Sequence, residues 1–394
     1  MTPVTITRAA GTTLLAVSMM VALTVAGLSA AMPSIAAHFA DVDDVAYLSR
    51  LVLVAPSLVI AVSSPIMGYI VDRFGRTKLL LAAVIMYGFV GGAGFFAEEI
   101  ETLILLRVLL GVAAAGVNTA VTTLTGDYFA GVDRQNFLGF RTGLSNLTNI
   151  GINICSGLLA AISWRMPFLM YFSVLLLVPF IALTMPEPAR LPVRTDIKAN
   201  PVVWPIGFLA ALYTASFLHN TTFYLIPVQL PFYLHALGVD DPRFSGAALA
   251  MTSLGLAAGS IAYARIRRLA GGPEAVFALA FVVIAAGMAA AAVAGSAIAA
   301  VIGLTIAGLG FGITFVNFSL WVIDRAPAEI RGRAVGGLMT STFLGHFAAP
   351  FWSQVLADRF GIASIYACGA LITAALAVAY VLARPKSHRS VVVR

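Results

Sequence analysis

One arginine and two histidines stand inside long apolar runs of this sequence. Arg107 lies in LLRVLLGVAAAG, His219 in SFLHNTTFYL and His346 in FLGHFAAP. An unpaired charge in hydrocarbon costs several kcal/mol, so Arg107 must face the protein interior, water or a partner. Histidine exchanges its proton near neutral pH. All three are candidates for proton coupling or for binding substrate. The alternative for each is a purely structural role. Arg107 would then bond to helix-end carbonyls, and each histidine would stay neutral, hydrogen-bonded to a neighbouring helix.

Three asparagines, Asn146, Asn149 and Asn153, recur at i, i+3 and i+7, which places them on one face of a helix. A polar side chain gains only about 0.6 to 2 kcal/mol from an interhelical hydrogen bond in a membrane. Three amides on one stripe therefore favour the wall of a wet substrate cavity over a helix-joining role. Further candidates for this cavity are polar or amphipathic residues of other apolar runs: Asn118, Thr222, Gln229, Tyr233, Asn317 and Trp321.

Metal binding and catalysis find weaker support. His219 and His346 lie on separate runs without a cysteine or carboxylate nearby, which makes a poor metal site. Ser216 and His219 stand one turn apart and could act as nucleophile and base, yet no surrounding motif supports an enzyme. Cys155 and Cys368 fall inside apolar runs, where we interpret them as small apolar residues. We expect no metal, no cofactor and no catalytic residue.

The elements that must position these side chains are membrane-spanning helices. The chain is 60% hydrophobic with a mean hydropathy of +0.96, against about 45–50% apolar residues in soluble domains. A helical span needs roughly 20 apolar residues, whereas a β-barrel would alternate apolar and polar ones. Twelve continuous apolar runs qualify: 11–32, 51–71, 79–97, 102–125, 138–162, 166–185, 204–234, 244–264, 275–295, 298–322, 335–357 and 361–383. The sequence predicts an all-α membrane protein of twelve transmembrane helices, the seventh broken by Pro227 and Pro231.

The distribution of positive charge predicts the orientation in the membrane. With both termini cytoplasmic, 19 of the 24 Lys and Arg residues lie in inner loops and tails. The exceptions are Arg50, Arg165, Arg243 and Arg359 outside and Arg107 within a span. This asymmetry follows the positive-inside rule, and we expect a bacterial cytoplasmic (inner) membrane. No soluble domain presents the net charge of +7 to nucleic acid, so the expected partners are the lipid bilayer and a small-molecule substrate of a monomeric protein.

An internal repeat divides the chain. The proline-rich, charged stretch PEPARLPVRTDIKANP at 186–201 separates two groups of six runs, 1–185 and 202–394. A displacement of 197 residues superposes DYFAGVDRQNFLG (127–139) on DRAPAEIRGRAVG (324–336). We infer a duplicated six-helix unit joined by a cytoplasmic linker, as in transporters whose pseudo-symmetric halves enclose a cavity.

The stretch GYIVDRFGRTK at 68–78 concentrates charge in a chain that is only 10% charged. It resembles the signature loop between the second and third helices of the major facilitator superfamily, Gly-x-x-x-Asp-Arg-x-Gly-Arg-Lys/Arg, except that Thr77 replaces the first basic residue of the tail and Lys78 follows. The resemblance covers essentially the whole chain. Gly68 has no side chain and so lets a neighbouring helix pack closely, while Gly75 supplies the backbone freedom of a tight turn.

The resemblance implies a gating role for this loop. Asp72 is expected against the positive end of the eleventh helix near Gly336, and Arg76 is expected to pair with Asp127. Such an anion at a helix N-terminus contributes about 0.3–1 kcal/mol when exposed and up to about 2 when partly buried. We call the expected set the latch, and it comprises Gly68, Asp72, Arg73, Gly75, Arg76, Asp127 and Gly336. The alternative is that the basic residues of the loop only set topology.

Further motifs are most similar to those of the twelve-helix drug and metabolite antiporter group, namely SWRMPF (163–168) and FLGHFAAP in the eleventh helix. Arg107 and Gly111 fit the fourth-helix motif of the superfamily, whose arginine is linked to proton coupling, although Leu110 stands where glutamine is usual. The resemblance implies alternating access and proton-coupled efflux of a small drug-like compound or metabolite.

Two departures keep a rival function open. The fifth-helix stretch 141–160 lacks the Gly-Pro pair of many drug exporters, and no carboxylate is plainly buried in a span. These features favour uptake or facilitated diffusion of a small polar or anionic solute, whose negative charge Arg107 could hold. More remote alternatives are a non-transporting receptor and an intramembrane enzyme.

Overall fold

The computed structural model describes residues 7–129, 131–188, 204–327 and 330–383, apart from the side chains of residues 72, 131–132, 134–136, 139 and 142. Most of the expected linker 186–201 therefore lies outside the described residues. The N-terminal half contains α1 (Arg8–Met20), α2 (Leu23–Ala26), α3 (Met32–His38), α4 (Val45–Phe74), α5 (Arg76–Ala93), α6 (Ile100–Tyr128), α7 (Gly131–Ala160), α8 (Leu169–Phe172) and α9 (Leu177–Thr184). The C-terminal half contains α10 (Ile206–Phe223), α11 (Leu225–Ala236), α12 (Pro242–Ala270), α13 (Pro273–Ala292), α14 (Ala297–Arg325), α15 (Arg331–Phe360) and α16 (Ala363–Leu382).

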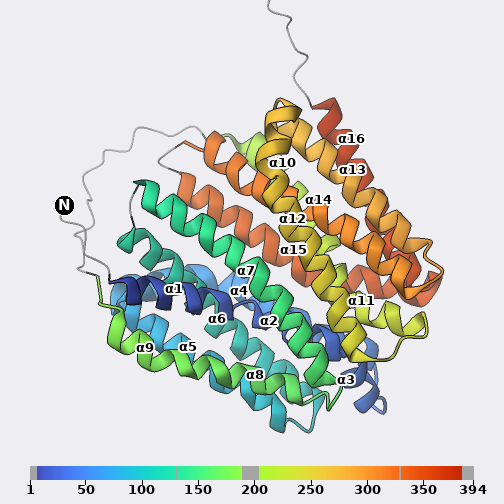
Figure 1. Cartoon of the computed structure of the whole chain (residues 1–394), viewed down its shortest axis with the longest axis horizontal. Coiled ribbons are helices and arrows are strands. Elements are labelled where there is room, and N and C mark those ends of the chain that lie inside the picture. The colour runs from blue at the N-terminus through green and yellow to red at the C-terminus, as the bar shows by residue number, and fades with distance from the viewer. Residues whose placement is uncertain (1–6, 130, 189–203, 328–329, 384–394) are drawn as a thin grey trace, which may run out of the picture.

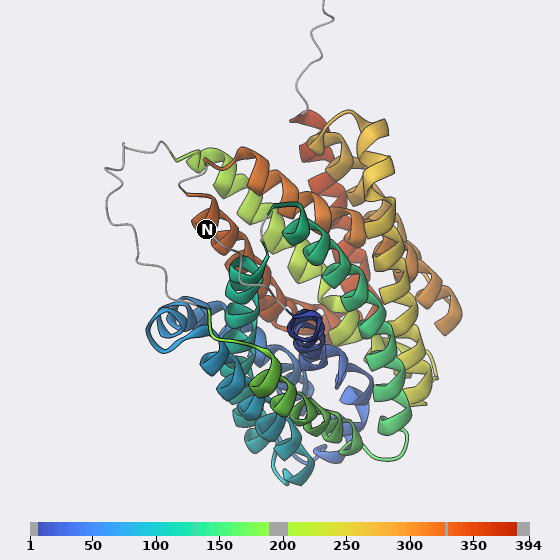
Figure 2. The same cartoon turned by 60° about the vertical axis from the view of Figure 1, so that its left-hand side comes forward.

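These segments form twelve helical units in two six-helix bundles, because α1–α3, α8–α9 and α10–α11 each make one interrupted unit. The N-terminal half runs from blue to green (α1–α9) and the C-terminal half from yellow-green to red (α10–α16), with the green α7 lying beside the yellow α12 (Figure 1 and Figure 2). The starts of α12, α13 and α14 follow those of α4, α5 and α6 by 197 residues, the displacement found in the sequence. The all-α, twelve-helix fold with two pseudo-symmetric halves is confirmed.

Among the described residues, nine helices are long and apolar enough to cross a membrane by length and composition. The other three units correspond to the predicted runs 138–162, 204–234 and 335–357. The first and third of these runs carry polar side chains along α7 and α15, and the second is interrupted between α10 and α11. These helices carry Asn146, Asn149, Asn153, Tyr224 and His346, which lie between the two halves.

Small residues set the closest helix packing inside the C-terminal bundle. A Cβ atom added to Gly259 on α12 would overlap the backbone carbonyl of Leu309, and one added to Gly312 on α14 would overlap that of Leu256. Close backbone approach of this kind is how helices associate in membranes, where no hydrophobic effect drives them together. Each half also has its own cluster of fully buried apolar side chains.

Two spans are interrupted near their middle. The break between α10 and α11 falls at Tyr224, because Pro227 has no N–H to donate to the carbonyl of Phe223. Pro231, by contrast, stays inside α11, so the prediction that both prolines break the helix was wrong for this one. The expected continuous run 11–32 is also interrupted, since Leu28 donates its N–H to Val25 and the carbonyl of Thr24 is left without its helical partner.

The two halves touch toward one side of the molecule, which we call the opposite side because it lies away from the turn at Gly75. The side of that turn, where Glu187 also lies, we call the linker side. On the opposite side α7 packs on α12: a Cβ atom added to Gly157 would lie 2.7 Å from the carbonyl oxygen of Pro242.

On the linker side the situation is reversed. A Cβ atom added to Gly68, Gly332 or Gly336 would have no other described atom within 4 Å. The close packing expected at Gly68 is therefore not seen among the described residues. The contact expected between Asp72 and the helix end near Gly336 involves a side chain outside the described residues and stays a prediction.

Candidate functional site

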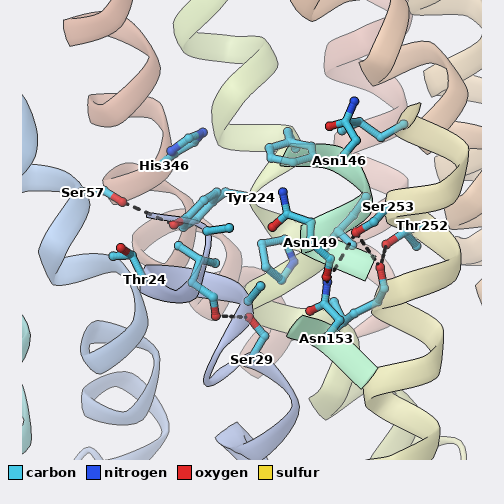
Figure 3. Close-up of a pocket in the computed structure, with 18 of the residues that line it drawn as sticks. Thr24, Ser29, Ser57, Asn146, Asn149, Asn153, Tyr224, Thr252, Ser253 and His346 are labelled. Atoms are coloured by element: carbon cyan, nitrogen blue, oxygen red, sulfur yellow. Dashed lines mark hydrogen bonds between the residues drawn. The ribbon is translucent and has the colours of Figure 1, made fainter. Parts of the chain in front are cut away.

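A cavity of about 310 Å³ lies between the two halves. Its polar wall combines amides, hydroxyls and one imidazole from both bundles (Figure 3): Thr24, Ser29, Ser57, Asn146, Asn149, Asn153, Tyr224, Thr252, Ser253 and His346. Apolar side chains complete it, among them Phe223, Phe315 and Phe343. Such a mixture of apolar surface with a few convergent polar groups is typical of small-molecule sites.

The asparagine stripe of α7 lines this cavity, as its helical spacing predicts. Asn153 is 5% exposed and donates to the Asn149 carbonyl at 2.9 Å and to Ser253 Oγ on α12 at 3.4 Å. Within the described residues, the amides of Asn146 and Asn149 make no side-chain hydrogen bond to protein. Asn153 therefore joins the halves, while the other two amides remain available to a solute.

His346 on α15 faces the asparagines across the cavity (Figure 3). Its Nε2 lies 3.0 Å from Asn220 Oδ1, and the Asn220 amide is oriented by donating to the Ser216 carbonyl at 2.8 Å. His346 Nε2 is consequently the donor, and Nδ1 of the neutral ring is an acceptor. The imidazole stacks on the ring of Tyr224, with centroids 4.1 Å apart, and Tyr224 Oη reaches Ser57 Oγ of the other half at 3.3 Å.

His219 does not line the cavity. It is fully buried in the C-terminal bundle, and its Nε2 donates to Thr314 Oγ1 at 2.6 Å, because that hydroxyl points its own proton at a helix carbonyl. Phe311, Phe315 and Phe318 surround the ring at centroid distances of 4.8 to 5.2 Å. The geometry matches the structural alternative for this residue, a histidine held by neighbouring helices.

Arg107 is 1% exposed and also lies outside the cavity wall. Its Nε donates to the Val52 carbonyl at 3.1 Å, one terminal nitrogen donates to Tyr171 Oη at 2.8 Å, and the other donates to the Thr24 carbonyl. Pro56 cannot donate to Val52, and the interruption of the first span frees Thr24. Arg107 thus donates to carbonyls that Pro56 and the interrupted first span leave without helical partners. This arrangement matches the purely structural role given above as the alternative for Arg107.

Six predicted cavity residues do not line this cavity. Thr222 donates to the Leu218 carbonyl, and Tyr233 donates to the Ala291 carbonyl at 2.8 Å inside the C-terminal core. Gln229 is fully buried toward the opposite side. A helical stripe drawn from His219 to Tyr233 fails because the helix is interrupted at Tyr224, which changes the direction of the side chains beyond it.

The remaining members of that set belong to α6 and α14. Asn317 accepts from Tyr263 Oη at 3.0 Å and donates to the Pro273 carbonyl, which ties α12 and α13 to α14. Trp321 packs on the ring of Phe208. Asn118 likewise lies outside the cavity wall. The side chains of Asn317 and Trp321 pack within one bundle, a role that sequence spacing does not separate from lining a cavity.

A polar contact that the sequence did not predict joins the halves toward the opposite side. Arg50, expected in an outer loop, is inside α4 and 5% exposed. Its Nε donates to Gln229 Oε1 at 2.9 Å, and Gln229 Nε2 donates to Ser353 Oγ at 2.8 Å. The guanidinium also lies 3.9 Å from the centre of the Phe232 ring. The available signal was the position of Arg50 directly before an apolar run.

On the linker side, the signature loop forms a tight turn between α4 and α5. Gly75 has φ +108°, the backbone freedom expected of it. Arg76 Nε stands 2.9 Å from Asp127 Oδ2, with both side chains partly exposed. The side chain of Asp72 lies outside the described residues, and Arg73 is exposed and donates to Tyr69 Oη at 3.1 Å. The ion pair is present, and the gating role of the latch stays a prediction.

Glu187 adds a contact to this turn that the sequence did not suggest. Its carboxylate accepts the backbone N–H of Arg76 at 2.6 Å and that of Thr77 at 3.0 Å, at the N-terminus of α5. A carboxylate here satisfies helix N–H groups that have no partner within the helix. Separately, no three His, Cys, Asp or Glu side chains in the described ranges are grouped to hold a metal ion.

Curated relatives share parts of the sequence. The chain is 32% identical to Multidrug resistance protein 1 of Bacillus subtilis over 160 residues, 39% of this chain and 40% of that protein. It is 31% identical to the Bacillibactin exporter of Bacillus subtilis over 129 residues, 30% of this chain and 31% of that protein. It is 27% identical to the class C tetracycline resistance protein of Escherichia coli over 268 residues, 64% of this chain and 65% of that protein. The matches thus span from under a third to just under two thirds of these relatives.

Solved structures share the fold over nearly the whole chain. A D-xylose-proton symporter superposes with a TM-score of 0.78 at 14% identity, covering 93% of this chain and 96% of that one. The xylose transporter XylE from E. coli, in an inward open conformation, gives 0.75 at 13% identity, covering 96% and 98%. A model of the Major Facilitator Superfamily matches residues 14–350. This chain is therefore a member of the Major Facilitator Superfamily, a multi-pass membrane transporter and not an enzyme.

Proposed function

We propose that this transporter exports a small organic compound by alternating access, exchanging it for protons. The observation that carries the proposal is the cavity between the two halves, with the unbonded amides of Asn146 and Asn149 in its wall. A solute bound there meets both bundles. Rocking of one bundle against the other would then expose the solute to either side in turn.

The contacts between the halves support this cycle. Toward the opposite side the halves are joined by Arg50 with Gln229, by Ser57 with Tyr224 and by Asn153 with Ser253. On the linker side, a Cβ atom added to Gly68 or Gly336 would meet no other described atom within 4 Å. We propose that the latch closes on the linker side when the opposite-side contacts open.

Export is favoured over uptake by the relatives, whose names refer to multidrug resistance, tetracycline resistance and bacillibactin export. For proton exchange, His346 is the histidine in the cavity wall, and an imidazole can carry a proton near neutral pH.

The rival function is uptake or facilitated diffusion of a polar solute. It keeps support because the described wall of the cavity contains no carboxylate. Its anionic form loses support, because the donors of Arg107 engage carbonyls and Tyr171 rather than the cavity.

The test is proton flux in everted vesicles energised acid-inside, followed with a pH-sensitive dye while drugs, sugars and organic anions are added. Recovery of the dye on adding one compound, absent from vesicles without the protein, is the expected result. The Asn149→Ala variant should need a higher concentration of the same compound. Uptake of a labelled compound without dye recovery for any panel member would replace export by facilitated diffusion.

A further inference from the structure

The described wall of the cavity holds no Asp, Glu, Lys or Arg side chain. Its polar groups are neutral amides and hydroxyls together with His346. Arg107 is the cation behind Thr24, and its guanidinium is engaged by two carbonyls and a phenol. Arg141, on α7 toward the linker side, is not part of the wall either. While His346 is neutral, a charged solute entering this cavity meets no opposite charge in the described wall.

The wall has two chemically different faces. His346 and Tyr224 form a stacked pair, with Phe343 edge-on to the imidazole at 5.7 Å between centroids. Asn146 and Asn149 lie across from the stacked pair (Figure 3). Tyr224 is only 3% exposed and backs the imidazole, so the partly exposed ring of His346 offers the flat surface for a solute ring. The unbonded amides offer both donors and acceptors.

The energetics separate uncharged from charged solutes. Removing a charge from water without a compensating partner costs far more than removing a hydroxyl or amide that finds a new hydrogen bond. The amides of Asn146 and Asn149 can replace water for a polar group, but they cannot neutralise an ion. A cation fares worst, since Arg107, a buried charge behind the described wall, is itself positive.

We propose that the cavity selects uncharged planar ring compounds that carry hydroxyl or amide groups, and that it rejects their charged analogues. The ring lies along the imidazole of His346, and its polar groups bond to Asn146 and Asn149. This selectivity rests on the proposed function in one respect, namely that the cavity is the substrate site.

The test is equilibrium binding to the purified protein in lipid nanodiscs without any ion gradient. The probes are nitrophenyl, naphthyl and coumarin rings, each prepared with a hydroxymethyl, a trimethylammoniomethyl or a carboxylate group. We expect at least one hydroxymethyl compound to bind, and to bind at least tenfold tighter than both of its charged counterparts in calorimetric titration. Equal binding by a charged counterpart, or no binding by any hydroxymethyl compound, would overturn the selectivity.

A charge placed in the wall should invert the preference. Asn149→Asp keeps the size of the side chain and should tighten binding of the trimethylammonium probe at least tenfold. The matched control Asn149→Leu should weaken the hydroxymethyl probe without any gain for the cation. If Asn149→Asp does not give folded protein, Asn146→Asp makes the same test, and no gain for the cation in a folded variant contradicts the proposal. Because no gradient is present, failure of proton-driven export leaves this result intact, and failure of selectivity leaves export untouched.

Discussion

Arg107 and the asparagine stripe of α7 are both polar features within the helices, yet they use their hydrogen bonds in opposite ways. The arginine gives its donors to Val52, Thr24 and Tyr171, all within the N-terminal bundle. Asn146 and Asn149 leave their amides unbonded beside a cavity. A fully bonded polar group stabilises the fold, whereas an unbonded one beside a cavity is available to a ligand. The hydrogen-bond partners of a polar residue within the helices, rather than its burial, therefore distinguish a structural role from a functional one.

The largest effect should come from Arg107→Leu. The substitution leaves the Val52 and Thr24 carbonyls and the Tyr171 hydroxyl with fewer partners, and each buried polar group left unsatisfied costs about 1–3 kcal/mol. We expect a loss of about 3 kcal/mol or more, seen as a strongly lowered melting temperature in detergent, with Arg107→Lys intermediate. An Arg107→Leu protein that melts like the wild type but fails to transport would reverse the comparison and make Arg107 a functional residue.

A smaller effect is expected from Arg50→Met, which removes a charged donor from Gln229 toward the opposite side. A hydrogen bond to a charged group contributes about 1.5–3 kcal/mol, so the halves should separate there roughly tenfold or more often. A cysteine at Ser57, with Cys155 and Cys368 replaced, should react correspondingly faster with a membrane-impermeant maleimide added from the opposite side. An unchanged rate would show that Arg50 does not hold this contact closed.

Asn149→Ala should affect transport while sparing stability. Because the amide has no protein partner, we expect a stability change within about 0.5 kcal/mol. We expect the KM for a transported compound to rise about tenfold, as for loss of one neutral hydrogen bond. Asn153→Ala is the informative control, since it also removes the bond to Ser253 and should lower the melting temperature. Normal transport by Asn149→Ala would place the substrate elsewhere.

The smallest change in stability should follow Asp127→Asn. Its ion pair with Arg76 is partly exposed, and such pairs contribute about 0.2–1 kcal/mol. We nevertheless expect transport to fall several-fold, because the latch has to close in each cycle. Arg268→Gln is the matched control, because Arg268 is an exposed cation in the last turn of α12 and does not belong to the latch. Equal activity of both variants would favour the topological interpretation of the basic residues.

The fold could be predicted from the sequence because each span is a long apolar run and the repeat of 197 residues marks the two halves. The asparagine stripe was also predictable, since three amides at i, i+3 and i+7 on one uninterrupted helix share a face. The stripe from His219 to Tyr233 was not, because the helix is interrupted at Tyr224. Arg107 looked functional because a sequence shows a buried charge but not the carbonyls freed by Pro56 and by the interrupted first span.

The interruption at Tyr224 has a mechanical consequence. One aromatic ring is at once part of the cavity wall, a member of the break between α10 and α11, and a hydrogen-bonding partner of Ser57 in the other bundle. A molecule that displaces this ring would disturb its hydrogen bond to Ser57 between the two bundles. It would also bend the span at the break between α10 and α11. We therefore expect Tyr224 to couple the binding of a molecule in the cavity to the separation of the two bundles.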